Sequence, residues 1–328
     1  MTTKRVRSAP GDPRGGAPTI RRPSPLALLA ACAAVAVAFA PVPAAAQQDD
    51  SIETEIVREG SVYMLVGRGG NVGLSIGEDG AFLVDDKFAP LTDEIRAAVA
   101  AFTDDEVEFV VNTHWHGDHT GGNENFGEAG SLIVAHENVR KRMNPRAFRD
   151  LVGRSEQAPD AALPVVTFTD AVTFHWNGDD IRAFHVEHAH TDGDAIIHFP
   201  EADVLHMGDT FFNGTYPFID VESGGSIDGM VTAARRALDL AGPNTRIIPG
   251  HGPLSDADGL RAYHRMLRSV RRRVQALIDE GRSLEEVVDS APTASFDAEW
   301  GGSDFMPPDR FACLVYRGMV EEERMTPC

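Results

Sequence analysis

Three histidines and an aspartate stand within six residues of one another in the segment Thr113-His114-Trp115-His116-Gly117-Asp118-His119. The segment directly follows residues 107–112, a largely apolar stretch that is typical of a buried strand. Imidazole nitrogens and carboxylate oxygens are the ligands that proteins offer to zinc and to non-haem iron. In such a loop alternate side chains point to one place, while an adjacent Asp-His pair points to another. The pattern therefore predicts a metal centre rather than a polar loop with incidental histidines.

Three further segments carry histidine or aspartate, and each also follows a predicted strand. They are His188-Ala189-His190-Thr191-Asp192-Gly193, Gly208-Asp209-Thr210 and Pro249-Gly250-His251-Gly252. Functional residues gather on the loops that a rigid sheet holds in place. Four loops of this kind, each with a histidine or an aspartate, predict that they contribute to one site.

The elements that position these loops fall into two groups of strands. In the first group, strands are predicted at 52–58, 62–66, 72–76, 81–84 and 107–112, with a helix at 91–102. In the second group, strands are predicted at 165–168, 171–175, 181–186, 195–199, 204–207 and 246–249, with a helix at 226–240. Each group ends in a strand that is followed by a histidine loop. This repetition predicts an α/β protein in which two similar layers pack sheet against sheet.

Outside these groups the pattern is less regular. Residues 144–162 are predicted to be an irregular surface insertion. A long helix is expected at about 256–280, with arginines on its exposed face, and the tail from 283 is expected to hold two short helices.

The order His-x-His-x-Asp-His, then a lone His before Thr, then Gly-Asp, then Gly-His-Gly resembles the metallo-β-lactamase superfamily. The resemblance covers about residues 53–255. It implies a four-layer αββα sandwich with mixed sheets, to which this chain adds a helical C-terminal extension. The domain boundaries expected from it are 47–255 for the metallo-β-lactamase-like domain and 256–328 for the extension packed on it.

The resemblance also implies a two-metal site and assigns its ligands. The first metal would be held by His114, His116 and His190, in the position directly before Thr191. The second metal would be held by Asp118, His119 and His251, and Asp209 would bridge both. Asp85 matches the structural aspartate that steadies the metal loop in the family.

Two zinc ions are the cofactors expected for this set, although other divalent metals, including iron, would fit the same ligands. Two such cations can share a hydroxide, because a metal-bound water has a pKa near 7. That bridging hydroxide would attack an amide, ester, thioester or lactone carbonyl of a small-molecule substrate. Asp118 or Asp209 would then carry a proton to the leaving group, and we treat both as candidate catalytic residues.

Two other functions fit parts of the pattern. The superfamily includes single-iron sulfur dioxygenases, which are oxidoreductases and use a subset of the same histidines and aspartates. A β-lactamase with promiscuous activity is the other alternative. The best-known zinc β-lactamases carry Cys at the bridging position and Lys three residues later, whereas this chain has Asp209 and Phe212. An Asp bridge instead resembles the glyoxalase II and lactonase branches.

Several residues around the motifs have less specific patterns. The segment 211–218 holds four aromatic residues, of which at least two are predicted to line a substrate cleft. His188 is predicted to line the pocket or support the ligands, without binding metal itself. The histidines that fall on predicted strands are expected to be hydrogen-bonded residues of the sheet; they are His175, His185, His198 and His206.

The first 46 residues carry basic residues, then an apolar run at 26–40, then a small-residue segment that ends at Ala46. This order predicts a secretory signal peptide and a periplasmic or extracellular protein, with no membrane span left after processing. Lipidation at Cys32 is a minor alternative. In an oxidising compartment Cys313 and Cys328 would either pair or stay as free thiols.

Charge excludes one class of partner. The chain has 30 basic and 50 acidic residues, a net charge of −20. Removing residues 1–46, which hold six basic residues and one acidic residue, takes the net charge to −25. A nucleic-acid binder needs a basic surface to contact phosphates, so no nucleic-acid partner is expected. The sequence leaves the oligomeric state open.

Overall fold

The computed structural model describes residues 50–144 and 158–328. The predicted signal peptide at 1–46 lies outside the described residues, as does most of the insertion predicted at 144–162. The described residues all belong to one structural unit. Within the described ranges, no helix has both the length and the apolar character needed to cross a membrane.

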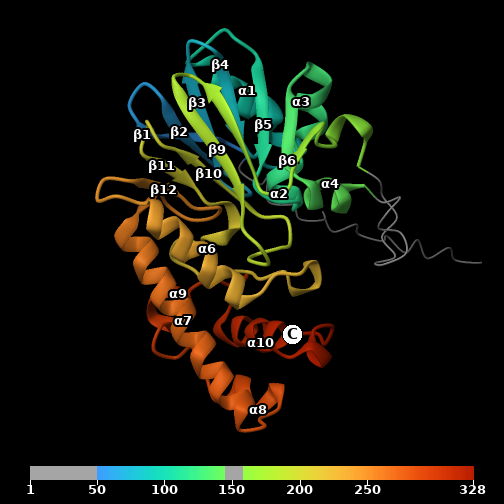
Figure 1. Cartoon of the computed structure of the whole chain (residues 1–328), viewed down its shortest axis with the longest axis vertical. Helices are drawn as coiled ribbons and strands as arrows, with labels where there is room; N and C mark the ends of the chain where they lie inside the picture. Colours follow the sequence, from blue (N-terminus) through green and yellow to red (C-terminus); the bar gives the residue numbers. More distant parts are fainter. Residues whose placement is uncertain (1–49, 145–157) are drawn as a thin grey trace, which may run out of the picture. The chain divides into compact units, whose positions relative to one another are not determined.

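The first sheet has seven strands that lie side by side in chain order (Figure 1). They are β1 (Glu53–Arg58), β2 (Val62–Val66), β3 (Val72–Gly77), β4 (Gly80–Val84), β5 (Val107–Asn112), β6 (Leu132–His136) and β7 (Val166–Phe168). Strands β1 to β4 pair antiparallel, and β4 to β7 pair parallel. Parallel neighbours need a crossover connection. Helix α1 (Thr92–Ala100) lies in the one from β4 to β5, and α3 (Asn123–Ala129) in the one from β5 to β6.

The second sheet has six strands in the order β13-β12-β11-β10-β9-β8. Their bounds are β8 (Ala171–Trp176), β9 (Asp179–His185), β10 (Ala195–Phe199), β11 (Val204–His206), β12 (Arg246–Ile248) and β13 (Ser255–Asp256). Only β11 and β12 pair parallel, and α6 (Ile227–Leu240) lies in the connection between them. Strand β13 is not among the predicted strands, because two residues are too few to show an alternating pattern.

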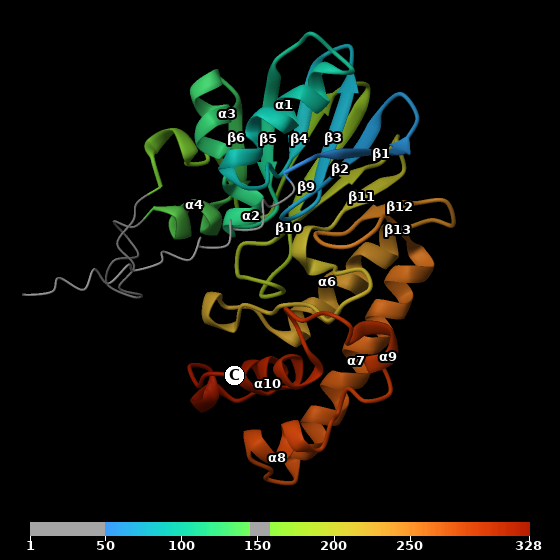
Figure 2. The same ribbon diagram turned by 180° about the vertical axis from the view of Figure 1, so that it is seen from behind.

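The two sheets pack face to face, as the alternation of side chains along each strand requires. In β2, Met64 joins a core that also contains Phe82 of β4 and Ile197 of β10. Its neighbours Tyr63 and Leu65 point to the other face of the sheet and join a separate core under α1 and α3. The predicted four-layer αββα arrangement is therefore confirmed, and Figure 2 shows the same layers from behind.

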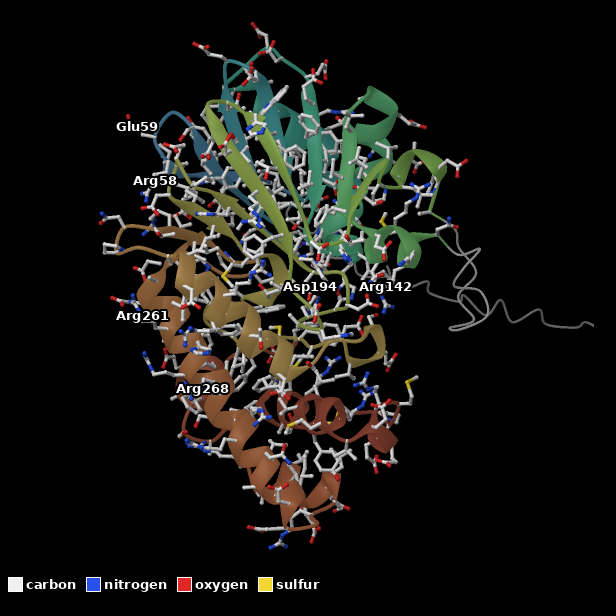
Figure 3. The ribbon with its side chains drawn as sticks, viewed as in Figure 1. Arg58, Glu59, Arg142, Asp194, Arg261 and Arg268 are labelled. Carbon is white, nitrogen blue, oxygen red and sulfur yellow. A yellow bond between two sulfur atoms is a disulfide. The ribbon has the colours of Figure 1, made fainter. Side chains whose placement is uncertain are left out.

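Helices α6 and α7 (Ala257–Asp279) cover the outer face of the second sheet. Helix α7 buries Leu260, Tyr263, Leu267 and Val270, a spacing of three or four residues that marks one face. Four of its arginines, Arg261, Arg265, Arg268 and Arg272, are exposed, and Figure 3 shows Arg261 and Arg268 pointing away from the molecule.

The tail holds more helix than the sequence predicts. Besides the short α8 (Leu284–Asp289) and α9 (Asp297–Trp300), it contains α10 (Pro308–Met319), a helix of 12 residues. Pro308 stands at the first helical position, where its missing N–H costs nothing. Helix α10 packs on α7 and α8 and buries Phe311 in the same core as α6. The predicted C-terminal helical region is therefore confirmed, with longer elements.

Short helical segments complete the fold. Helix α2 (Gly117–Thr120) starts inside the first histidine motif, and α4 (Glu137–Met143) follows β6. Single turns of 3-10 helix occur at η1 (Ala89–Leu91), η2 (Asp160–Ala162), η3 (Gly208–Thr210), η4 (Val221–Ser223) and η5 (Glu321–Glu323).

Candidate metal centre

The four predicted loops meet at one place, although they come from both sheets. The loop after β5 and helix α2 supply the first motif, and the loop after β9 supplies His190. Turn η3 supplies Asp209, and the loop after β12 supplies His251. Two groups of ligand atoms result, with the atoms of each group within 4.8 Å of one another. One group is His114, His116, His190 and Asp209, and the other is Asp118, His119 and His251.

Asp209 lies between the two groups and presents one carboxylate oxygen to each. Its Oδ2 is 3.8 Å from His114 Nε2 and 3.5 Å from His190 Nε2. Its Oδ1 is 3.0 Å from His119 Nε2 and 3.4 Å from His251 Nε2. A carboxylate in this position can bridge two cations. Asp118 Oδ2 completes the second group, 3.3 Å from His251 Nε2.

Three of the histidines are oriented by a hydrogen bond on the ring nitrogen that faces away from the centre. His114 Nδ1 donates to Thr113 Oγ1 over 3.0 Å, and His190 Nδ1 donates to the Phe218 carbonyl over 2.9 Å. His119 Nδ1 donates to Asp85 Oδ2 over 2.7 Å. Each bond fixes the neutral tautomer that leaves the Nε2 lone pair directed into the site, which is how ligating histidines are usually held.

Asp85 is the residue that holds this network together. Its carboxylate accepts hydrogen bonds from the Thr113 amide at 2.7 Å and from the Thr113 hydroxyl at 2.8 Å, in addition to the one from His119. It therefore orients His119 directly and His114 through the Thr113 hydroxyl. The family resemblance implies this supporting role, and the contacts are those that the role requires.

Asp220 is a supporting residue that the sequence did not reveal. Its Oδ2 accepts from His116 Nε2 over 2.9 Å, so that His116 offers Nδ1 to the centre. The loop that contains Asp220 follows the aromatic segment 211–218, and no spacing pattern connects it with the first motif. Only the three-dimensional arrangement brings His116 and Asp220 together across 104 positions of sequence.

The protein atoms alone leave this centre incompletely satisfied. His114 Nε2, His119 Nε2 and Asp209 Oδ1 are buried and lack a hydrogen-bond partner. His116 Nδ1 and His190 Nε2 are 2.9 Å apart, and in neutral rings with the tautomers above both atoms are acceptors. Unpaired buried acceptors are costly, whereas a divalent cation would satisfy them. The residues therefore fit a metal centre.

Burial and the neighbouring carboxylates shift the ionisation of the ligand histidines in opposite directions. Burial would lower the pKa of His119 and of His251, but Asp209 and the other nearby carboxylates raise the pKa of His119 well above its usual value and that of His251 to about 9. Burial lowers the pKa of His114 well below its usual value and that of His190 to about 4, which keeps both rings neutral. Burial would raise the pKa of Asp209, but His119 and the neighbouring imidazoles lower it well below its usual value. Neutral imidazoles and an ionised carboxylate are the forms that bind metal.

Two glycines allow the backbone to approach the ligands closely. A Cβ on Gly70 would lie 2.1 Å from His119 Cε1, and a Cβ on Gly250 would lie 2.1 Å from Asp209 Oδ1. Gly70 also accepts a hydrogen bond from the buried Lys87 ammonium, beneath the site. The loop of His251 is tied down by Asn71, whose side-chain amide donates to the carbonyls of Pro249 and Gly252.

A cavity of about 510 Å³ opens onto the centre. Its lining includes His116, Asp118, Asp209 and His251, together with Phe212 and Phe218 of the predicted aromatic segment. The two other aromatic residues of that segment, Phe211 and Tyr216, are fully buried in the core instead. The tail also contributes to this cavity, through Ser303 and Phe305.

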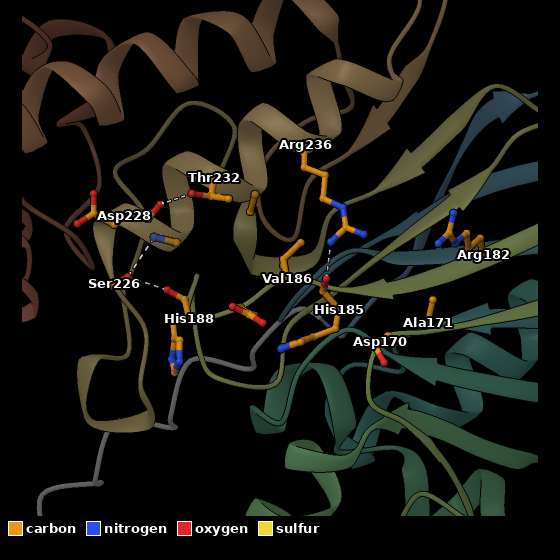
Figure 4. A pocket seen from close by; sticks show the side chains of 13 residues that line it. Asp170, Ala171, Arg182, His185, Val186, His188, Ser226, Asp228, Thr232 and Arg236 are labelled. Atoms are coloured by element: carbon orange, nitrogen blue, oxygen red, sulfur yellow. Dashed lines mark hydrogen bonds between the residues drawn. The ribbon is translucent and has the colours of Figure 1, made fainter.

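The remaining histidines lie apart from the metal centre. His188 Nδ1 donates to the Gly224 carbonyl over 3.0 Å, and the residue lines a separate cavity of about 570 Å³ (Figure 4). In the same view Arg236 donates to the His185 carbonyl. His185 and His206 are hydrogen-bonded to backbone carbonyls, as expected for histidines of a sheet.

The family model of the metallo-β-lactamase superfamily matches residues 65–251, which is more than half of the chain. The chain belongs to this superfamily. The matched range contains all seven ligand candidates, from His114 to His251.

Curated relatives in the superfamily match over part of their length. The lactamase-like protein aptB of Emericella nidulans is 29% identical over 195 residues, which cover 57% of this chain and 52% of that protein. A β-lactamase-like protein 2 homolog of Caenorhabditis elegans is 28% identical over 178 residues, which cover 53% of this chain and 52% of that protein. A hydroxyacylglutathione hydrolase of Erythrobacter litoralis is 29% identical over 111 residues, 32% of this chain and 35% of that protein. The chain thus spans about half the length, or less, of these relatives.

Solved structures share the fold. The metallo-β-lactamase from Pontibacter korlensis superposes with a TM-score of 0.55 and 19% identity, over 66% of this chain and 99% of that one. DIM-1 metallo-β-lactamase superposes with a TM-score of 0.54 and 18% identity, over 66% of this chain and 97% of that one. At these identities the likeness concerns the fold, and the site residues have to carry any functional conclusion.

Proposed function

We propose that this protein is an exported dinuclear zinc hydrolase that cleaves the carbonyl bond of an amide, ester, thioester or lactone. The observation that carries the proposal is Asp209, which presents Oδ2 to one ligand group and Oδ1 to the other. A protein that held a single ion would need only one of these groups. A second complete group, within reach of the same carboxylate, supports two ions.

The chain's own residues would divide the work as follows. When bound, two divalent cations supply a water of lowered pKa as nucleophile and polarise the carbonyl oxygen. His114, His116 and His190 would hold one ion, Asp118, His119 and His251 the other, and Asp209 both. Asp85 and Asp220 keep the rings of His119 and His116 in the orientation that the ions require.

Asp118 is the residue that we assign to proton transfer. Its side chain is 24% exposed and lines the cavity, whereas the Asp209 side chain is 6% exposed. Burial would raise the pKa of Asp118, but His119 and His251 lower it, so that it is ionised and able to accept a proton. Asp209, enclosed by four imidazoles, is better suited to hold metal than to exchange protons with a substrate.

The bridging aspartate also separates this proposal from a dedicated β-lactamase. In place of the Cys and Lys expected of the best-known zinc β-lactamases, the chain has Asp209 and Phe212. The similarity to a hydroxyacylglutathione hydrolase agrees with hydrolysis of an ester-like bond, although the export that we propose implies a different substrate. Weak hydrolysis of β-lactams is compatible with the site.

Export is part of the proposal and rests on residues 1–46. Expression of the full chain in a Gram-negative host, followed by fractionation, tests it. We expect the protein in the periplasm with an N-terminus at Gln47, as read from the intact mass. Retention of residues 1–46 in the cytoplasm would overturn this part, and a lipidated N-terminus at Cys32 would replace it by membrane anchoring.

Metal content is the decisive measurement for the enzyme itself. Elemental analysis of the purified protein should find about two zinc ions per chain. Asp209→Asn should lower the metal content and abolish hydrolysis of a panel of lactones, thioesters and β-lactams. Asp180→Asn, on an exposed part of β9, is the matched control and should change neither. A single iron that persists after zinc is added would instead favour the sulfur dioxygenase-type reaction, and oxygen consumption would then be assayed.

A further inference from the structure

Three phenylalanines surround the open side of the metal centre. Phe212 stacks on the ring of His251 with the ring centroids 5.1 Å apart. Phe218 lies 6.0 Å from the ring of His116 and 5.7 Å from that of His190. Phe305, from the tail, faces Phe218 at 6.1 Å and closes the wall. A bound substrate would therefore meet an apolar surface directly beside the metal ligands.

Few polar side-chain groups line this cavity besides the metal ligands. Apart from the metal ligands, its lining has only the hydroxyls of Thr215 and Ser303. Ser303 Oγ already accepts hydrogen bonds from the amides of Phe305 and Met306. Thr215 Oγ1 is engaged with the Tyr216 carbonyl. Little remains to bind a polar part of a substrate beyond the metal centre itself.

No lysine or arginine lines this cavity among the residues that the structure describes. Lys87 is buried and donates to the Gly70 carbonyl, and Lys141 pairs with Glu137 on α4. Arg310 lies beside the wall, with its guanidinium over the ring of Phe305 and one N–H donating to the Phe305 carbonyl. It positions Phe305 and is not itself part of the lining. Apart from cations held by the metal ligands, a carboxylate on the substrate would find no lysine or arginine partner in this lining, on a strongly acidic protein.

We propose that the site selects an uncharged substrate whose acyl part is apolar, and that Phe218 and Phe305 determine this specificity. The selectivity of the pocket stands on its own geometry; the statement that such compounds are hydrolysed rests on the proposed function. Phe305 is 58% exposed, an unusual position for a large apolar side chain, and it contacts Phe218 of the cavity wall and the guanidinium of Arg310. A ligand that fills the cavity would cover it.

A pair of fluorescent probes tests the pocket without turnover. N-phenyl-1-naphthylamine is neutral, and 1-anilinonaphthalene-8-sulfonate has the same ring system with one added sulfonate. We expect the neutral probe to bind at least tenfold more tightly, with zinc present or removed. Phe305→Ala and Phe218→Ala should each weaken it by about tenfold, the effect of losing roughly half the burial of an aromatic side chain. Phe102→Ala, whose ring packs on Tyr63 away from the cavity, is the matched control and should bind as the wild type does.

The reaction gives a second measurement. Across p-nitrophenyl acetate, butanoate and hexanoate, kcat/KM should rise about fourfold for each methylene, the value expected for burial of a CH₂ group. Phe305→Ala should flatten this rise, and Phe102→Ala should keep it. Preferential binding of the sulfonated probe, equal binding of both probes, or neutral-probe binding that neither phenylalanine variant weakens would overturn the inference. Selective binding of the neutral probe without hydrolysis of any ester would leave the pocket as proposed and overturn the hydrolase instead.

Discussion

Asp85 and His119 are joined by a hydrogen bond of 2.7 Å in which both side chains are completely buried. The bond ties the end of β4 to the metal loop after β5, because Asp85 also accepts from the backbone and hydroxyl of Thr113. Asp85 adopts φ +65°, a left-handed conformation that aspartate tolerates better than most residues. A strained backbone and three hydrogen bonds are thus concentrated on one carboxylate that does not face the cavity.

Replacing Asp85 by asparagine should therefore weaken metal binding without removing a ligand. The carboxylate uses Oδ2 for His119 and the Thr113 hydroxyl and Oδ1 for the Thr113 amide, whereas an amide has only one accepting oxygen. Its NH₂ group would face a donor, so the rings of His119 and His114 lose their orientation. We expect zinc affinity to fall 10- to 100-fold, as is usual for residues that orient ligands. Competition with a chromogenic chelator measures it. An affinity within threefold of the wild type, in a variant with an unchanged circular dichroism spectrum, would contradict this role.

Asp220 offers a selective version of the same experiment, because it contacts His116 of the first ligand group. In Asp220→Asn we expect one zinc to bind about tenfold more weakly, while the second keeps its affinity. Stepwise removal with a chelator, followed by elemental analysis, separates the two ions. Equal weakening of both would mean that Asp220 acts on the centre as a whole rather than through His116.

Stability should depend on pH through a pair of histidines outside the metal centre. The rings of His136 and His185 stack with centroids 3.8 Å apart. Burial, and to a lesser extent His185, lowers the pKa of His136 to about 4 from the usual 6.5. The unfolded chain therefore binds a proton on His136 more readily than the folded chain does. The stability associated with neutral His136 is fully present above about pH 6.5 and is lost as the pH falls toward 4.

Urea unfolding of the metal-free protein at several pH values measures this effect. The free energy of unfolding should fall more steeply from pH 7 to pH 4.5 in the wild type than in His136→Asn. Asparagine keeps a side-chain acceptor for the Asn138 amide at the start of α4, which His136 now supplies. His175→Asn, at an exposed site, is the control and should keep the wild-type slope. Identical slopes in the wild type and His136→Asn would refute the assignment.

Much of the fold and of the centre was predictable because each depends on local patterns. Strands such as 107–112 are largely apolar, and the ligands stand directly after them, where strand ends meet. The family resemblance assigned each loop residue to one of two expected ions. The structure brings Asp209 between the two groups of ligands. The position of His190 directly before Thr191 distinguishes it from His188 as the expected ligand. The geometry supports this assignment, because His188 donates to the Gly224 carbonyl.

The parts that sequence did not reveal depend on contacts between distant segments. Asp220 supports His116 from a loop with no motif of its own, and Phe305 reaches the cavity from a tail whose packing no periodicity predicts. The sequence alone also left the pairing of Cys313 open, since spacing does not distinguish a disulfide from two free thiols. In each of these cases the contact partner is known only from which residues lie close together in the folded chain.

In the structure Cys313 and Cys328 form a disulfide across 15 positions of sequence, which ties the segment after α10 to that helix. Closing a loop of this length restricts the unfolded chain and is worth about 3 kcal/mol. Cys328→Ser should therefore lower the free energy of unfolding by about that amount. Dithiothreitol should lower the free energy of unfolding of the wild type equally and should leave that of Cys328→Ser unchanged. Met325→Ser, an exposed substitution in the same segment, is the control and should have no such effect. Insensitivity of the wild type to reductant, with free thiols detected before unfolding, would show that the two cysteines are not paired in the purified protein.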